Sequence, residues 1–180
     1  VVDAMKAFRA EAVRLGRLVK AEQELSRTFT ELTAKTDSAP LAVSLSLEAA
    51  DLAESAGAVD EAAGALKKGL EKANDNADLL ERLVEVYLAA KRWADADAVL
   101  RKQLSLAAAE DKVALGLRLT QVNSELTRPS EAARALSDAL KAGADEAVHL
   151  PRLAELYEKG GQLRELTEVQ ARLIARHEAA

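Results

Sequence analysis

Apolar and polar residues alternate along the chain in a pattern typical of paired α-helices. Around the only tryptophan, apolar or small side chains stand at Leu83 and Tyr87, and then at Ala96, Leu100 and Leu104. A spacing of four residues places side chains on one side of an α-helix. The stretch between Tyr87 and Ala96 carries charged residues and predicts a turn. We therefore expect two antiparallel helices here, joined by a short connection.

The same two stripes return along the chain with a nearly constant period. The small or apolar residue that begins the second stripe recurs at separations of 34, 36 and 34 residues, at Ala62, Ala96, Ala132 and Leu166. The first stripe begins 13 residues earlier in each unit, at Ala49, Leu83, Leu119 and Leu153. A helical hairpin that repeats with this period predicts an all-α array of stacked hairpins.

The segments between the stripes contain residues that favour turns and helix caps. Pro129 fits the first turn of a helix, where no amide donor is lost. The Asn and Asp residues of KANDNAD and AGADEA can end one helix and cap the next. Pro151 would remove a hydrogen bond inside a helix, so the helix that contains it either begins late, near His149 or Leu150, or is kinked, and we favour the late start.

The repeated hairpin resembles the tetratricopeptide repeat. In residues 77–110 the matches in kind are Leu80, Leu83, Tyr87, Trp93, Ala96, Leu100 and Leu104. Lys91 stands where the family has a turn glycine, and Val84 and Gln103 stand where small residues are usual. The resemblance implies a right-handed α-solenoid of antiparallel helical hairpins, a TPR-like α-α superhelix, with Trp93 packed between helices.

The spacing predicts four repeats, at residues 43–76, 77–110, 113–146 and 147–180. Residues 1–42 are expected to form N-terminal helices and a degenerate first repeat, with Thr28 at the small-residue place. Gln170 replaces the leucine of the preceding units, as expected where no further repeat follows. Because the chain begins with Val1 and not with Met, we expect it to be a segment of a longer protein.

Composition and charge narrow the possible functions. The net charge of the 180 residues is −5, so the surface repels phosphate backbones and nucleic-acid binding is not expected. No apolar run approaches the roughly 20 residues of a membrane-spanning helix, so membrane insertion is not expected. The Ala-, Leu-, Arg- and Glu-rich composition is typical of bacterial proteins. The lack of a signal peptide favours the cytoplasm, unless a targeting signal precedes Val1.

Candidate catalytic and metal-binding residues do not form a plausible site. Asp95 and Asp97 lie two apart, about 200° around a helix, and cannot converge on one substrate atom. We expect both on the outer surface beside Ala96. His149 and His177 lack neighbouring ligands, and there is no cysteine. The sequence therefore predicts a protein that is not an enzyme and has no cofactor or metal.

The resemblance implies that the first helices line a concave groove for a partner peptide or helix. Two columns of residues would face it: Arg14, Glu48, Arg82, Arg118 and Arg152, and beside them Arg17, Asp51, Glu85, Gln121 and Glu155. Arginine pairs with carboxylates and phosphates in a forked geometry, which suits an anionic partner. Alternatively, Arg82 with Glu85 and Arg152 with Glu155 neutralise each other, and the acidic column suits a partner of mixed charge.

The leading hypothesis is therefore a noncatalytic protein-protein interaction scaffold that binds a partner peptide or helix in this groove. The alternative is a structural array that self-associates as a homo-oligomer, or a spacer within a larger multidomain protein. The two hypotheses differ in whether the array contacts a different protein or a second copy of itself.

Overall fold

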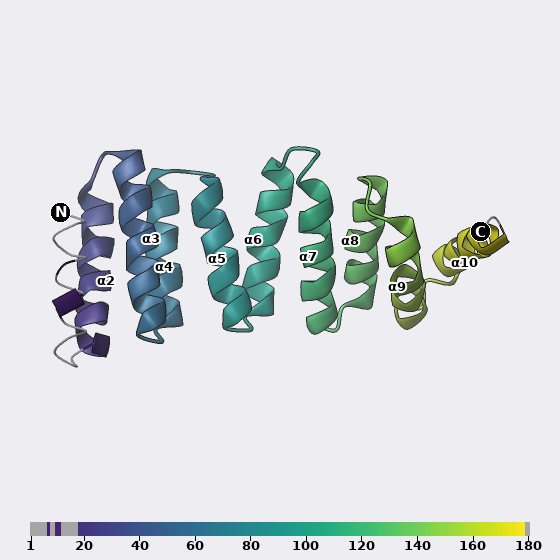
Figure 1. Ribbon diagram of the computed structural model, residues 1–180, viewed down its shortest axis with the longest axis horizontal. Helices are drawn as coiled ribbons and strands as arrows, with labels where there is room; N and C mark the ends of the chain where they lie inside the picture. Colours follow the sequence, from purple (N-terminus) through teal and green to yellow (C-terminus); the bar gives the residue numbers. More distant parts are fainter. Residues whose placement is uncertain (1–6, 8–9, 12–17, 179–180) are drawn as a thin grey trace. The chain divides into compact units, whose positions relative to one another are not determined.

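The computed structural model describes residues 7, 10, 11 and 18–178 of the chain (Figure 1). All regular structure in these residues is α-helical, so the expected all-α class is confirmed. The chain divides into two compact units, residues 1–92 and residues 93–180.

The first unit contains four described helices: α2 (Leu18–Lys35), α3 (Ala39–Ser55), α4 (Val59–Lys72) and α5 (Ala77–Ala89). Helices α3 and α4 pack against each other as a hairpin, α2 packs on both of them, and α5 packs on α4 and α3 (Figure 1). A core cluster lies among the first three of these helices and consists of Leu25, Phe29, Leu45, Ala49, Leu52 and Ala65.

The second unit contains α6 (Trp93–Leu106), α7 (Lys112–Glu125), α8 (Pro129–Lys141), α9 (Glu146–Lys159) and α10 (Leu163–Glu178). Each helix packs on the next one along the chain, as consecutive hairpins do (Figure 1). The core at its C-terminal end joins α8, α9 and α10 and contains Ala132, Ala133, Leu136, Leu150, Leu153, Leu156, Tyr157 and Val169.

The predicted stripes are the buried faces of these helices. On the first helices the buried residues include Ala49, Ala53, Leu83, Tyr87, Leu119, Asn123, Leu153 and Tyr157. On the second helices they include Ala62, Leu66, Ala96, Leu100, Ala132 and Leu136. The alanines have no exposed surface, which fits a place where helix backbones approach closely.

The turn within each predicted hairpin has the same backbone geometry. One residue per turn has a positive φ: Gly57 (74°), Lys91 (57°), Thr127 (54°) and Gly161 (68°). Its amide donates to the carbonyl three residues back, and the next amide donates to the carbonyl five residues back, as Arg128 does to Asn123 at 2.9 Å. These bonds satisfy carbonyls at the end of the first helix, as in a Schellman motif. Lys91 and Thr127 adopt the glycine conformation at an energetic cost.

Helix starts follow the predicted capping residues. The Asn76 side chain accepts a hydrogen bond from the Leu79 amide at 3.0 Å and caps α5. The Asp145 side chain accepts from the Ala147 amide at 2.8 Å and caps α9. Pro129 is the first residue of α8, so the prediction that it lies in a first turn is confirmed.

Two predictions about the last repeat are wrong. Helix α9 begins at Glu146 and contains Pro151 in its interior, because the Asp145 cap fixes the start upstream of the proline. A strict spacing of four from Leu166 predicts that Ile174 packs as well, but in α10 the buried residue is Val169, and Ile174 is 60% exposed. This helix packs on α9 through Leu166, Val169 and Leu173, with spacings of three and four, so the strict spacing of four is right at Leu166 and wrong at Ile174.

Helix α2 also differs from the pattern of the later units. Thr28, expected at the small-residue place, is exposed, whereas its neighbour Phe29 is buried. Ser26 is buried too, and its hydroxyl donates to the Ala49 carbonyl at 2.8 Å. The core face of α2 is therefore turned by about one residue from the expected face, and the repeat boundaries along the chain stay a prediction.

Candidate partner-binding surface

The predicted columns of groove residues come from the first helices α3, α5, α7 and α9. Asp51, Glu85, Gln121, Arg152 and Glu155 are exposed, and Glu48, Arg82 and Arg118 are half-buried. Each of these helices thus carries one accessible polar side chain or more at the corresponding place. Arg14 and Arg17 lie outside the described residues.

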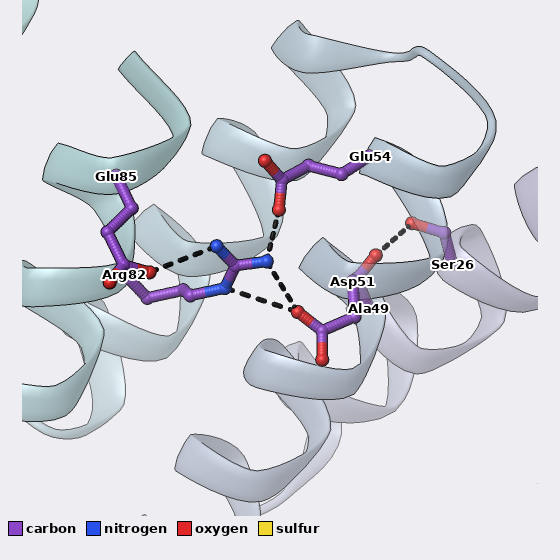
Figure 2. Close-up of polar contacts among 6 residues, drawn as sticks. All are labelled: Ser26, Ala49, Asp51, Glu54, Arg82 and Glu85. Carbon is purple, nitrogen blue, oxygen red and sulfur yellow. Dashed lines mark hydrogen bonds and ion pairs between the residues drawn. The ribbon is translucent and has the colours of Figure 1, made fainter. Parts of the chain in front are cut away.

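In the first unit, Arg82 binds three carboxylates (Figure 2). Its Nη2 donates to Asp51 Oδ1 at 2.7 Å and to Glu54 Oε2, and its Nε donates to Asp51 Oδ1 at 3.2 Å. Its Nη1 donates to Glu85 Oε2 at 3.1 Å. Asp51 and Glu54 come from α3, whereas Arg82 and Glu85 come from α5, so this cluster joins two consecutive first helices.

The electrostatics of the cluster keep Arg82 charged. Burial lowers the pKa of Arg82, but the hydrogen bond to Asp51 and the charges of Glu54 and Asp51 outweigh burial and raise the pKa overall. One positive charge faces three negative charges, so the cluster is net acidic. An anionic partner would therefore have to displace carboxylates that already hold the guanidinium.

Part of the cluster around Arg82 was predicted from the sequence. The i, i+3 pair of Arg82 with Glu85 is present. The stronger contacts to Asp51 and Glu54 cross between helices 31 and 28 residues apart, and spacing along a single helix cannot reveal them. Within the described part of the chain, the analogous pair of Arg152 with Glu155 does not form.

In the second unit the structure brings together several of the predicted residues. Arg118, Gln121 and Arg152 line a cavity of about 210 Å³ between α7 and α9, together with His149. Arg152 and Glu155 also line a larger cavity of about 830 Å³ at the turn between α7 and α8. Arg152 therefore lines both cavities, one with the column residues of α7 and the other with Glu155.

The larger cavity includes residues that the sequence analysis missed. Arg128 lies in the turn before α8, Lys159 lies at the end of α9, and Val148 and Pro151 lie on α9. None of them belongs to the two columns, because the columns were drawn from one position per repeat. In the sequence, a proline and a valine near the start of α9 were the features that could have pointed to this cavity.

Asp97 is not a surface residue, contrary to the prediction. It is buried on α6, where it accepts a hydrogen bond from Asn123 Nδ2 of α7 at 2.8 Å and one from Arg101 Nε at 2.8 Å. The hydrogen bond to Asp97 raises the pKa of Arg101. Asn123 also donates to the Leu119 carbonyl at 2.9 Å. The contact is structural, because both carboxylate oxygens are engaged inside the helix packing.

Two other kinds of site are absent from the part of the chain that the structure describes. There, no group of three or more His, Cys, Asp or Glu side chains is arranged to hold a metal ion. No helix among the same residues is both long and apolar enough to cross a bilayer.

The packed hairpins and the accessible side chains of their first helices define a helical-repeat protein. Residues 53–118 match the family model described as tetratricopeptide repeat. The predicted resemblance is thereby confirmed. This fold in general forms protein-interaction scaffolds.

Solved structures with the same fold cover almost the whole chain. A structure of MamA AMB-1 is 21% identical, covers 96% of this chain and 95% of its own, and has a TM-score of 0.53. MamA residues 41 to the end from Desulfovibrio magneticus RS-1 are 14% identical over 98% and 95% of the two chains, with a TM-score of 0.52. A putative kinesin light chain of Podosopora anserina with nearly identical TPR-like repeats is 19% identical over 97% and 93%, with a TM-score of 0.54. No curated protein matches the sequence.

Proposed function

We propose that the protein is a noncatalytic scaffold that binds a partner protein through the first helices of its hairpins. A peptide or helix of the partner would lie against these helices, as solenoid repeats bind along extended surfaces. The observation that carries the proposal is the set around Arg152, where Arg118, Gln121 and Arg152 from two successive first helices line one cavity.

The first helices of the two units differ in the charges that they offer to a partner. In the first unit the cluster around Arg82 is already paired and net acidic, so it favours basic or mixed-charge segments of a partner. In the second unit the cations on α9 are accessible. The contrast supports the expectation of a partner with mixed charge over a uniformly acidic partner.

Site-specific photo-cross-linking tests the proposal. A photoreactive amino acid at Gln121, on the first-helix face of α7, should capture discrete partner proteins from cells. The same amino acid at Lys102, exposed on the second helix α6, serves as the matched control. Capture of the same proteins from both positions, or of none from Gln121, would contradict the proposal.

Self-association is the second candidate, and exposed apolar residues on α10 favour it. Leu163 is 71% exposed and Ile174 is 60% exposed. Such side chains gain from burial against another copy. Light scattering over a range of concentrations should then show a dimer, and Ile174→Glu should return it to a monomer. A monomer at every concentration would exclude this candidate.

A further inference from the structure

The cavity of about 830 Å³ in the second unit carries an unusual combination of side chains. Three cations surround it, Arg128 from the turn between α7 and α8 and Arg152 and Lys159 from α9, with Glu155 as the one carboxylate on its wall. Its volume falls within the range of ligand-binding sites. The cavity therefore has a local positive charge on a protein whose net charge is −5.

The cations of this cavity differ from most of the described arginines in having no internal partner. Five arginines outside the cavity, for example, form ion pairs with carboxylates: Arg27, Arg82, Arg92, Arg101 and Arg172. Among the described residues, Arg128, Arg152 and Lys159 have no ion pair and no side-chain hydrogen bond. Their charged groups are therefore accessible to an external anion, and binding would not require a carboxylate of the protein to be displaced.

Apolar side chains accompany these charges. Val148 is 63% exposed and Pro151 is exposed, both on the wall of the cavity. Leu156 is buried and contributes to the same wall. An exposed valine beside a cavity gains from burial under an apolar group of a ligand. The cavity thus offers an apolar contact surrounded by three cationic groups.

We propose that this cavity binds an acidic peptide segment of the partner, in which Asp or Glu residues flank one aliphatic side chain. The carboxylates would pair with Arg128, Arg152 and Lys159, and the aliphatic group would cover Val148 and Pro151. Glu155 and the negative net charge of the chain disfavour nucleic acid, because its repeated phosphates are repelled by negative charge. The inference rests on the proposed function and names the chemistry of the segment bound at one place.

Fluorescence anisotropy on the full chain tests the inference, with labelled short peptides in which Glu and Asp flank a single leucine. The test variant carries Arg128→Glu and Lys159→Glu. The control variant carries Arg134→Glu and Arg164→Glu, two exposed cations of the same unit outside this cavity, with the same change in net charge. Each lost charge-assisted contact should weaken binding about tenfold or more in the test variant. The control should stay within about twofold of the parent, since exposed charges at a distance are largely screened.

The apolar contact has its own readout. Replacing the leucine of the peptide by serine, or Val148 by Asp, should each weaken binding, and amide shifts in nuclear magnetic resonance spectra should locate the peptide at Val148 and Arg152. Equal loss in the test and control variants would overturn the inference, as would equal binding of the serine peptide or of single-stranded DNA. Failure of every acidic peptide to bind, with partner capture at Gln121 intact, would refute this inference and leave the proposed function standing.

Discussion

Replacing Thr127 by glycine should stabilise the protein. Thr127 occupies the turn between α7 and α8 with φ of 54°, and it is exposed. A left-handed conformation costs a residue other than glycine about 1 to 2 kcal/mol, and a β-branched side chain lies at the unfavourable end of this range. Glycine removes that cost but loses about 0.5 to 1 kcal/mol through the greater entropy of the unfolded chain.

The net gain in the free energy of unfolding is therefore about 1 to 1.5 kcal/mol. The Thr127 hydroxyl donates to the Leu126 carbonyl at 2.7 Å in an exposed position, and losing this bond should change little. For a chain of this length the gain corresponds to an increase in melting temperature of about 2 to 6 °C. Urea denaturation and thermal melting followed by circular dichroism would measure both quantities.

The same turn elsewhere in the chain provides matched controls. Gly161 has φ of 68°, and a Cβ added there meets no atom within 4 Å, so Gly161→Thr should lose stability through the backbone alone. Thr127→Ala keeps the left-handed strain and should gain less than Thr127→Gly. The reasoning is refuted if Thr127→Gly lowers the melting temperature, or if Thr127→Ala gains as much as Thr127→Gly.

Three further predictions concern the helix packing. Asn123→Ala should cost about 2 to 3 kcal/mol in the free energy of unfolding, because it leaves the buried Asp97 without one of its donors. Adding Asp97→Ala should recover part of the loss. A double variant whose loss is the sum of the two single losses would argue against the coupling. Gly69→Ala should cost about 1 to 3 kcal/mol by thermal melting, since the new Cβ would lie 2.4 Å from Ser46 Oγ, and unchanged stability would contradict the close contact. Arg82→Met should destabilise the first unit by about 1 kcal/mol at low salt through repulsion among three carboxylates. The loss of stability should shrink as the salt concentration rises. A loss that does not depend on salt would mean that packing, and not charge, is its cause.

The helical stripes were predictable because each depends on the spacing within one helix. Leu83, Tyr87, Ala96 and Leu100 lie on one side of their helices, and burial of those sides forms the core. Repetition of the pattern added the pairing of helices, since a unit with two apolar faces needs neighbours on both. The all-α class and its hairpins follow from these two facts.

The polar contacts between successive helices were not predictable in the same way. Asp97 was placed on the surface because a charged residue beside an alanine usually faces solvent. Its burial depends on Asn123, 26 residues later, which supplies a hydrogen bond across the packing of α6 on α7. A signal was present: Asp97 stands where Ala63 and Ala133 stand in neighbouring units, and Asn123 stands where Tyr87 does. When two positions of the repeat both depart from the usual residue in neighbouring helices, a contact between them is indicated. The spacing within a single helix does not include this information.

The candidate site was likewise predictable only in part. The exposure of Gln121 and Glu155 follows from their helical phase, and the structure agrees with it. The pairing of Arg82 with Asp51 and Glu54 depends on how α3 lies beside α5, and the cavity at Arg128 depends on how a turn lies beside α9. Both are properties of tertiary packing, so spacing along one helix carries no information about them.

The bond between Asp97 and Asn123 limits how freely the repeats could be exchanged. Stacked hairpins are often interchangeable, because each interface resembles the next. Here α6 buries a carboxylate that only the following helix satisfies with an amide. Excision of residues 113–146 would bring Tyr157 to the place of Asn123, and an aromatic ring would then face the carboxylate. In lineages that gain or lose whole hairpins, Asp97 and Asn123 would have to be inherited together.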